Sequence, residues 1–314
     1  MALSPGPGAA DGVPLVSIVV PAYNHAAYLA EAVDSVLAQR YPNVELLVLD
    51  DGSDDGTVEV LERYTGRCYW DSHPNMGQSA TLNKGWAKAS GSILGYLSAD
   101  DALLPDAVGT LVARLAADPG AVLAYPDYEL IDRRSRPVRR VRAADFDYRD
   151  MVVRFACPPG PGALFRRSAL EAAGPWDRRR TMAPDYDFWL RLGLHGRFTR
   201  VPEVLARFRV HDGSLSFSAD SERASEEYVA ITTEYFRSGV VPAGLRPARR
   251  EALSNAYLVA ARSHLKSDRY ARGLGCAWRA LALHPRNLTP RAFKLLATGL
   301  SHRLRFGGRR RGGR

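Results

Sequence analysis

Two short apolar runs in this sequence each lead into a pair of aspartates. Asp50 and Asp51 follow the first run, and Asp100 and Asp101 follow the second. Neighbouring carboxylates repel one another unless a cation or a hydrogen-bond donor lies between them, and carboxylate oxygens are the ligands that hard divalent cations prefer. Two such pairs predict a site for a cation, a hydrogen-bonding ligand or both. The alternative for either pair alone is a helix N-cap or a turn, where aspartate is common.

Alternating strands and helices place both pairs. Strands are predicted over 15–20, 44–49 and 93–97, and helices over 28–37, 54–64, 78–89 and 105–116. This alternation is typical of a mostly parallel sheet flanked by helices. Because ligands of such sheets bind at the carboxyl ends of the strands, we expect the two pairs to face one crevice. Pro21 has no N–H to donate, so it should stop the ladder of the first strand.

The pattern loosens beyond residue 120. Strands are predicted over 121–125, 162–166 and 204–210, and a helix with an apolar stripe begins near Asp185. From about residue 221 onward only helices are predicted, and residues 262–285 resemble one helix-turn-helix of the tetratricopeptide type. A lone repeat of this type cannot bury its own apolar face, so we expect it to pack against the α/β body.

Composition excludes several classes of protein. The 314 residues are 46% hydrophobic and 25% charged, as in an ordinary soluble globular protein, and no apolar stretch approaches the roughly 20 residues of a membrane span. Residues 1–14 lack a basic start and an apolar core, so they are interpreted as a disordered leader rather than a signal peptide. Cys68, Cys157 and Cys276 fit neither a disulfide framework nor a zinc spacing, which favours reduced cysteines in a cytoplasmic protein.

The positive charge lies at the C-terminus. Residues 272–314 contain eleven Lys or Arg and no acidic residue, which exceeds the net charge of +9 of the whole chain. The basic tail, residues 301–314, suits anionic lipid headgroups, and its lack of aromatic residues argues against stacking on nucleic acid bases. We therefore expect no nucleic acid partner. The tail either contacts the inner face of a membrane or merely aids solubility.

Six stretches between residues 15 and 218 together resemble the family-2 glycosyltransferases, in the order and spacing of that family. They are Val19–Asn24, Asp50–Thr57, Asn75–Gly85, Leu97–Asp101, Asp185–Arg191, and Phe208–His211 with Ser214 and Ser216. The resemblance implies a GT-A-like, Rossmann-related α/β domain over residues 15–220 that binds a nucleotide sugar, followed by a helical region over 221–300. It also implies inverting transfer of a sugar, from a nucleotide diphosphate donor such as a UDP-sugar, to a hydroxyl acceptor in cell-surface polysaccharide or glycolipid synthesis.

The donor is expected to meet residues from four of these stretches. A uracil ring offers an imide N–H between two carbonyls, so a carboxylate at a strand end can accept that hydrogen while an aromatic face stacks on the ring. By resemblance, the residues expected to bind the donor are Pro21, Tyr23, Asn24, Asp50, Asp51, Lys84 and Asp100. The alternatives are that Tyr23 is a half-buried core aromatic and that Lys84 is an exposed lysine near a helix end.

A divalent cation, Mn²⁺ or Mg²⁺, is expected to neutralise the diphosphate as the sugar leaves. The family carries an Asp-X-Asp element for this purpose, and here Ser98 stands where its first aspartate often does. Asp101 remains as the predicted metal ligand beside Asp100. By resemblance His211 lies near the metal and the diphosphate, as a ligand or as a phosphate donor; without the resemblance it would be an ordinary surface histidine.

The acceptor hydroxyl needs a base, because it loses its proton as it attacks the anomeric carbon. The family supplies a Glu-Asp pair at a helix start, and this chain has Pro184 and Asp185 there. Asp185 is therefore the predicted general base. The alternative is that it only caps free N–H groups of the helix. Trp176 resembles an acceptor-side residue of the family and either stacks on a sugar or packs in the core.

Two other functions compete with this interpretation. A nucleotidyltransferase would carry a Gly-rich basic loop directly after the first strand, and the residues from Pro21 to Asn24 are neither. A catalytically decayed nucleotide-sugar-binding or scaffold protein would keep the fold and lose the chemistry. Ser98 and Pro184, which depart from the family pattern, keep this second alternative open.

Overall fold

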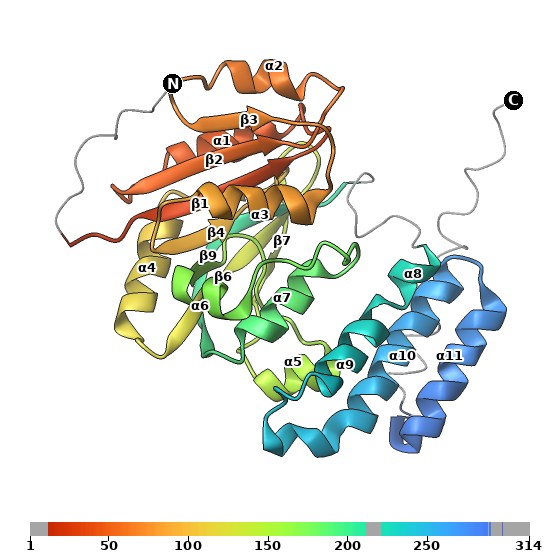
Figure 1. Ribbon diagram of the computed structural model, residues 1–314. Helices are drawn as coiled ribbons and strands as arrows, with labels where there is room; N and C mark the ends of the chain where they lie inside the picture. Colours follow the sequence, from red (N-terminus) through yellow and green to blue (C-terminus); the bar gives the residue numbers. More distant parts are fainter. Residues whose placement is uncertain (1–11, 212–220, 288, 290–296, 298–314) are drawn as a thin grey trace, which may run out of the picture. The chain divides into compact units, whose positions relative to one another are not determined.

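The computed structural model describes residues 12–211, 221–287, 289 and 297 (Figure 1). The predicted tail, most of the predicted leader, and Ser214 and Ser216 lie outside these residues. The chain divides into two compact units. The first contains residues 1–146, 157–178 and 188–212, and the second contains residues 147–156, 179–187 and 213–314.

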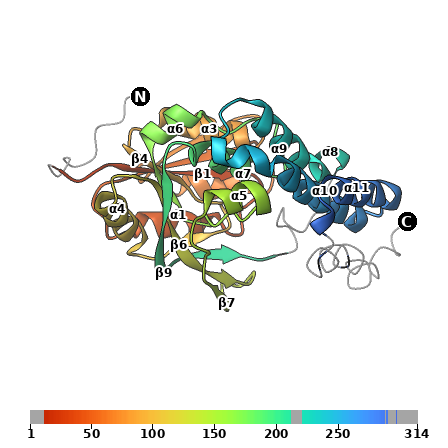
Figure 2. The same cartoon turned by 90° about the horizontal axis from the view of Figure 1, so that it is seen from below.

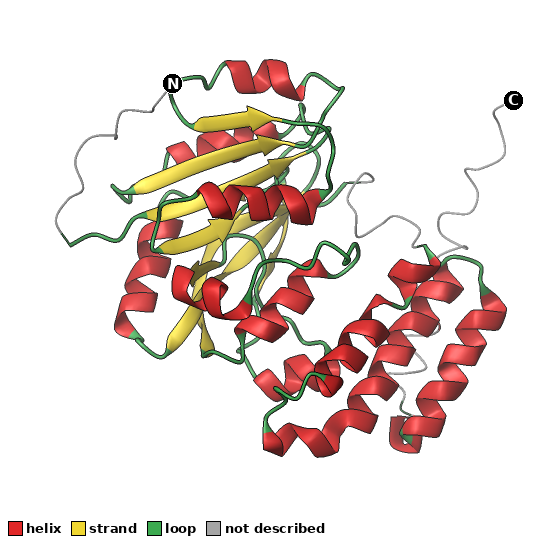
Figure 3. Ribbon diagram, in the orientation of Figure 1, coloured by secondary structure: helices red, strands yellow, loops and turns green. Residues whose placement is uncertain are grey.

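The first unit is built on one sheet (Figure 3). Its strands are β1 (Val16–Ala22), β2 (Val44–Asp50), β3 (Tyr69–Ser72), β4 (Ile93–Tyr96), β5 (Ala102–Leu103), β6 (Ala121–Ile131), β7 (Pro137–Val141), β8 (Leu164–Arg166) and β9 (Arg197–Arg209). Its helices are α1 (Leu29–Leu37), α2 (Thr57–Glu62), α3 (Gln78–Lys88), α4 (Ala107–Ala117) and α6 (Arg167–Ala173). Helix α7 (Pro184–Leu192) begins in the second unit and ends in the first.

The order of the strands is β3-β2-β1-β4-β8-β6-β9-β5, and β7 pairs with β6. Strands β3, β2, β1 and β4 run parallel, as the alternation of strands and helices predicts. The other half of the sheet is mixed, because β8 is antiparallel to both β4 and β6, while β9 is parallel to β6. Strands β6 and β7 are joined by the short segment 132–136, which leaves no room for the crossover that a parallel pair requires.

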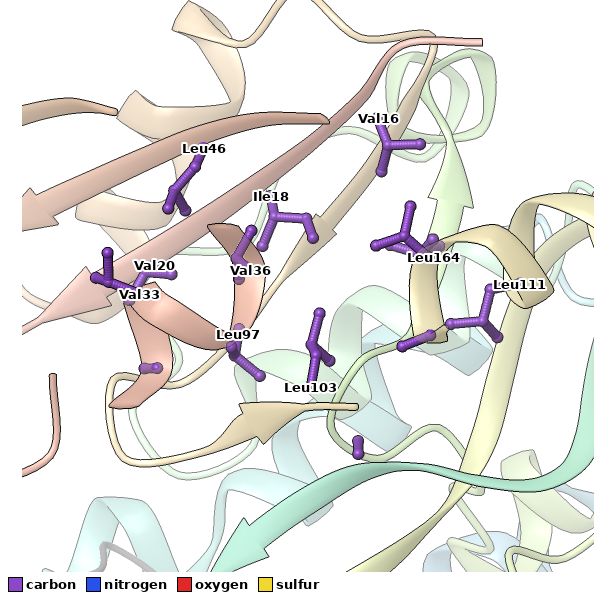
Figure 4. Packing of buried hydrophobic residues seen from close by; sticks show 14 of the residues in the cluster. Val16, Ile18, Val20, Val33, Val36, Leu46, Leu97, Leu103, Leu111 and Leu164 are labelled. Atoms are coloured by element: carbon purple, nitrogen blue, oxygen red, sulfur yellow. The ribbon is translucent and has the colours of Figure 1, made fainter. Parts of the chain in front are cut away.

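Strand β1 is buried along its whole length because helices cover both faces of the sheet (Figure 1). Successive side chains of a strand point to opposite faces. Val16, Ile18 and Val20 therefore pack in one core with Val33 and Val36 of α1 (Figure 4). The side chains between them face the opposite side, where α3 lies against β1 and β2.

Pro21 does not end β1, contrary to the prediction. The pairing with β2 continues to Ala22, whereas the pairing with β4 ends at Val19. Val19 O accepts from Leu97 N and Ala22 O accepts from Asp51 N. Odd-numbered residues of β1 thus direct their hydrogen bonds toward β4 and even-numbered residues toward β2. The missing N–H of Pro21 falls on the side where the ladder has already ended, so it costs the pairing with β2 nothing.

Several elements differ from those predicted. Helix α2 is shorter than the predicted 54–64, because Asp55 accepts hydrogen bonds from Thr57 N and Ala26 N in the preceding loop. Strand β9 begins well before the predicted 204. Strands β3, β5 and β7 and helices α5 (Tyr148–Arg154) and α6 were not predicted. They are short or polar, so they carry little hydrophobic periodicity.

We expect Gly85→Ala to destabilise the first unit by about 1–3 kcal/mol, as overpacking of a core does. Gly85 lies on the buried face of α3, where an added methyl group would overlap Val19 and come within 2.7 Å of Leu49 Cδ1. Gly109→Ala in α4 is the matched control. Its methyl group would meet no atom closer than 3.9 Å, so it should stabilise its helix by about 0.5–1 kcal/mol. Urea unfolding of both variants measures the difference, and equal effects would contradict the packing of α3.

The second unit is helical in its described part. Besides α5 and the start of α7 it contains α8 (Glu222–Ser225), α9 (Glu227–Arg237), η2 (Ala243–Ala248), α10 (Arg249–Lys266), α11 (Tyr270–Leu283) and η3 (Pro285–Asn287) (Figure 2). Helices α10 and α11 pack as a pair over the predicted helix-turn-helix, although α10 begins before the predicted residue 262. Among the described helices, none is long and apolar enough to cross a membrane.

Candidate functional site

The carboxyl ends of β1, β2 and β4 lie at the same edge of the sheet, because the three strands are parallel neighbours. The strand order changes direction at β1, with β2 and β3 on one side and β4 on the other (Figure 1). Such a switch point opens a crevice in which α/β proteins bind ligands. The structure thus brings Asp50, Asp51, Asp100 and Asp101 to one edge, as predicted from the two apolar runs.

Asp51 organises the loop that leads into α3. Its Oδ1 accepts from Met76 N at 2.7 Å and its Oδ2 accepts from Gly77 N at 3.0 Å. Gly52, the next residue, needs to be glycine: its φ is +78°, and a Cβ atom there would lie 2.8 Å from Asn75 N. Each carboxylate oxygen can accept a second hydrogen bond, so Asp51 keeps the capacity to accept the imide N–H of a base.

Asp50 is directed into the protein. Its side chain is fully buried, and its Oδ2 accepts from Ser72 Oγ at 2.7 Å, with Ser53 N at 3.3 Å from the carboxylate. These partners come from β3 and from the loop after β2. The hydrogen bonds of Asp50 therefore hold the loop after β2 in place.

The loops after β1 and β2 are hydrogen-bonded to one another. Asn24 has a left-handed backbone with φ 56°; its N–H donates to Ser53 Oγ at 2.8 Å, and its Oδ1 accepts from Asp54 N at 3.0 Å. Tyr23 beside it is 48% exposed, so it is not the core aromatic of the alternative interpretation. Pro21 is buried within β1. Tyr23 thus offers an exposed ring at the predicted donor edge, and Asn24 shapes the loop.

Lys84 lies in an ion pair that the sequence did not suggest. Its Nζ is 2.6 Å from Asp71 Oδ2 at the outer strand β3, and its side chain is 37% exposed. A phosphate would have to share this lysine with Asp71. The predicted role of Lys84 in donor binding remains a prediction.

Asp100 and His211 lie in contact, although 111 positions separate them in the sequence. His211 Nε2 is 3.0 Å from Asp100 Oδ2, and the imidazole packs 5.0 Å from the ring of Tyr28. Asp101 is buried, and its Oδ1 accepts from Arg209 N at 2.9 Å. Burial raises the pKa of Asp101 well above its ordinary value, and the nearby charge of Asp100 raises it further.

Arg209 joins the parts of this cluster. Its guanidinium is almost fully buried, lies 4.6 Å from the ring centre of Tyr28, and donates from Nη2 to Glu31 Oε2 at 2.6 Å. It also donates from Nε to Asp100 O at 2.7 Å and from Nη1 to Asp132 O at 3.1 Å. The arginine ties the loop after β4 to α1 and to the segment 132–136. Sequence reasoning included Arg209 in a motif but assigned it no role, since a buried arginine and an exposed one look alike in a sequence.

A cavity of about 450 Å³ adjoins His211. It is lined by Asp132, Arg133, Arg134, Arg136, Val210 and His211. Arg136 forms an ion pair with Asp132 at 2.7 Å, and hydrogen bonds from Arg136 lower the pKa of Asp132 to about 2. With three arginines against one aspartate, which is already paired with Arg136, the lining residues favour a negatively charged ligand.

The donor types at the edge suit a divalent cation, but the three predicted ligands only partly converge: Asp101 Oδ1 is hydrogen-bonded to Arg209 N, and the ligand atoms of Asp100, Asp101 and His211 do not all lie within 4.8 Å of one another. Asp100 and Asp101 are adjacent carboxylates, and His211 brings an imidazole nitrogen to the first of them. Oxygen donors suit both Mg²⁺ and Mn²⁺, and an added imidazole suits Mn²⁺ better. The raised pKa of Asp101 is also what a cation would reverse, because it stabilises ionised carboxylates.

Among the residues that the structure describes, the one group of three potential metal ligands whose ligand atoms lie within 4.8 Å of one another is in the helical unit, formed by Glu226, His264 and Cys276. Here the hydrogen bonds argue against a metal. Arg269 Nε donates to His264 Nδ1 at 2.9 Å, so Nε2 carries the proton of the neutral ring and faces Glu226 Oε1 at 3.2 Å. A metal could bind Nε2 only by displacing that proton, so this group is a structural network of the bundle.

Asp185 lies in the first turn of α7, in the second unit. Its side chain is half-buried, and its Oδ1 accepts from Tyr186 N at 2.8 Å. Burial raises the pKa of Asp185 above its ordinary value, and the negative charge of Glu227 raises it further. The bond to Tyr186 agrees with the capping alternative, while a raised pKa is a common property of a carboxyl group that accepts a proton in catalysis.

Trp176 is a core residue. It is 3% exposed and packs 5.3 Å from the ring of Tyr96 and 6.0 Å from that of Trp86. Its backbone is fixed by Asn83, whose Nδ2 donates to Trp176 O at 2.8 Å. The interpretation of Trp176 as a sugar-stacking residue is therefore wrong, and its alternative, core packing, is correct.

Solved structures with a similar fold are glycosyltransferases of the GT-A type. A crystal structure of S. aureus TarS in complex with UDP-GlcNAc has a TM-score of 0.66 at 17% identity, covering 95% of this chain and 93% of that one. The mannosyltransferase PcManGT from Pyrobaculum calidifontis, in complex with GDP-Man and Mn²⁺, has a TM-score of 0.59 at 21% identity, covering 94% of this chain and 81% of that one. The predicted fold class is confirmed.

Relatives at the level of sequence agree. An uncharacterized glycosyltransferase of Rickettsia typhi is 31% identical over 231 residues, which cover 71% of this chain and 72% of the relative. The hyaluronan synthase of Pasteurella multocida is 27% identical over 73% of this chain, although the match spans 24% of that longer protein. The family described as glycosyl transferase family 2 matches residues 17–174. With this match over half of its length, the chain belongs to glycosyl transferase family 2 and is a glycosyltransferase.

Proposed function

We propose that this glycosyltransferase moves a sugar, with inversion, from a UDP-sugar to a hydroxyl group of a glycan or lipid-linked acceptor in the synthesis of cell-surface polysaccharide or glycolipid. The observation that carries the proposal is the contact between Asp100 and His211 at the sheet edge where Asp51 and Tyr23 also lie. A carboxylate, an imidazole and an exposed aromatic ring at one edge are the groups that a nucleotide diphosphate needs.

In this proposal, the loops after β1 and β2 bind the nucleotide end of the donor. Tyr23 supplies an exposed ring for stacking on the base, and Asp51 can accept the imide N–H of uracil. The similar structures contain UDP-GlcNAc in TarS and GDP-Man in PcManGT. A carboxylate can accept the single imide N–H of uracil or the ring N–H and amino group of guanine, so the choice of UDP rests on the resemblance and is tested with both nucleotides below.

Residues on the other side of the crevice bind the diphosphate in this proposal. Asp100, Asp101 and His211 would hold Mn²⁺ or Mg²⁺, which when bound neutralises the charge that develops on the leaving diphosphate. The arginines of the neighbouring cavity, Arg133 and Arg134 among them, add positive charge from the protein itself. Charge-assisted hydrogen bonds of this kind hold a departing phosphate in place.

Asp185 is the proposed base for the acceptor. Inversion in one displacement needs a single carboxylate to take the proton of the attacking hydroxyl, and no second carboxylate as a nucleophile. The raised pKa of Asp185 makes it a better proton acceptor than an ordinary aspartate. A cytoplasmic location, and a contact of the tail with the inner face of a membrane, rest on the sequence; residues 301–314 lie outside the described residues.

The proposal is tested with a panel of UDP- and GDP-sugars. We expect slow release of the nucleoside diphosphate from at least one UDP-sugar in the presence of Mn²⁺ or Mg²⁺, with water as the acceptor, and no release after removal of the metal by EDTA. A decayed sugar-nucleotide-binding scaffold, which the serine at Ser98 keeps as the alternative, would bind a donor without turnover. If donors from the panel bind but none releases its nucleoside diphosphate, the protein is the scaffold and not the active enzyme.

A further inference from the structure

Helix α7, which carries Asp185, is held at its start by a glutamate from another helix of the same unit. Glu227 is the first residue of α9, and the residue is 3% exposed. Its Oε1 accepts from Met182 N at 2.8 Å and from Ala183 N at 2.7 Å. Its Oε2 accepts from Thr181 N at 2.9 Å. Three consecutive backbone N–H groups thus converge on one buried carboxylate.

The segment before α7 cannot cap the helix by itself. Ala183 O accepts the first helical bond, from Asp187 N at 3.1 Å, so Ala183 occupies the N-cap position and has no side-chain oxygen to offer. Pro184, the next residue, has no N–H and suits the first helical position. Of the three N–H groups that donate to Glu227, only that of Ala183 belongs to the N-cap residue, and the other two precede the helix. Glu227, more than 40 positions later in the chain, therefore fixes the segment that enters α7.

Helix α9 holds the same segment at a second point. Arg180 is buried and donates from Nη2 to Glu234 of α9, and its Nε lies 3.8 Å from Asp187 Oδ1. Glu227 and Glu234 are seven residues apart, which places them two turns apart on one face of the helix. Residues 180–183 are thus fixed by two glutamates of α9, and only Pro184 separates this segment from Asp185.

We propose that Glu227 is a positioning residue that holds Asp185 in place for proton transfer. The inference rests on the proposed function, in which Asp185 is the base. A carboxylate displaced by about 1 Å from its reacting partner can lower a rate about 100-fold. Fixing residues 181–183 by three hydrogen bonds limits such displacement at Asp185.

Glu227 also acts on Asp185 through its charge. The charged groups beside the first turn of α7 in this unit are Arg180, Asp187, Glu234 and Glu227, and the charge of Glu227 contributes to the raised pKa of Asp185. Replacing Glu227 by a neutral residue should therefore lower the pKa of Asp185. A base works only when ionised, so the acid limb of the rate profile should move to lower pH.

The experiment compares Glu227→Gln, Glu227→Asp and a matched control, Glu226→Gln, in the full chain. The control removes the neighbouring glutamate and its contact with His264. The readout is metal-dependent release of nucleoside diphosphate from the donor that the panel selects, measured below the unfolding temperature of each variant. Glutamine should lower kcat about 10- to 100-fold, leave donor affinity unchanged and shift the acid limb to lower pH. Aspartate keeps the charge but not the reach, so kcat should fall without that shift.

A rate and pH profile of Glu227→Gln equal to those of Glu226→Gln would overturn the inference. If Glu227→Gln does not fold, Glu227→Asp and the control decide on the rate alone. Titration of the Asp185 carboxyl by ¹³C NMR, assigned through its loss in Asp185→Asn, needs no turnover; an unchanged pKa in Glu227→Gln would also overturn the inference. Full activity of Asp185→Asn would instead remove the proposed base, so the two failures are distinguishable.

Discussion

Replacing Asp101 by asparagine should lower the affinity for a UDP-sugar in the presence of Mn²⁺ about 100-fold, which is about 3 kcal/mol. The variant removes one of the adjacent carboxylates that would hold the cation. Asparagine keeps a carbonyl oxygen that can accept from Arg209 N, so the loop after β4 should keep its place. Alanine would leave that buried N–H without a partner and add a loss of stability.

Calorimetric titration of the donor, with Mn²⁺ and with EDTA, measures this effect. We expect wild-type protein to lose affinity in EDTA and Asp101→Asn to bind equally weakly under both conditions. Asp106→Asn is a suitable control, because Asp106 is an exposed aspartate of the same unit that pairs with Arg40. Unchanged metal-dependent affinity in Asp101→Asn would contradict the assignment of the cation to this edge.

Replacing Asp185 by asparagine should lower kcat about 100- to 10,000-fold, the range that a positioned general base contributes. The affinity for the donor should stay unchanged, since Asp185 is not among the residues proposed to bind the donor. In the wild type the rate should decrease as the pH falls through the raised pKa of Asp185, because only the ionised carboxylate can take a proton. The acid limb should therefore lie above the ordinary aspartate value of about 4.

Steady-state rates of nucleotide release across the pH range measure both effects. Asp150→Asn serves as the control, because Asp150 is an aspartate of the same unit whose side chain pairs with Arg154 on α5. It should keep the rate and the acid limb of the wild type. A fully active Asp185→Asn variant would exclude Asp185 from the mechanism and return it to the role of a helix cap.

The first half of the fold follows from local pattern. Strands β1, β2 and β4 are apolar runs with turn residues after them, and α1, α3 and α4 show helical spacing, so each element is visible in its own residues. Strand β7 is different: Pro137–Val141 is largely exposed and contains two arginines. Its strand conformation comes from pairing with β6. No pattern in the residues of β7 themselves predicts a strand there.

The candidate site shows the same division. Asp51 and Asp100 are found from the strands that they follow, and His211 only from the resemblance to the family. Arg209 and Glu227 act through contacts with residues far away in the sequence. Nothing around Glu227 indicates that it would bind the segment before another helix, because sequence signals for a helix start are normally read within one turn.

The hydrogen bonds that join the loops after β1 and β2 bear on how quickly a nucleotide can be recognised. Asn24, Ser53 and Asp54 are joined to one another by hydrogen bonds within the protein. Ordering a backbone residue costs about 1–2 kcal/mol in conformational entropy. Because these hydrogen bonds order the loops when the protein folds, the cost is not incurred again when the nucleotide binds. The base end of the crevice should therefore receive its ligand as a rigid receptor, with an association rate governed by diffusion and orientation instead of loop closure.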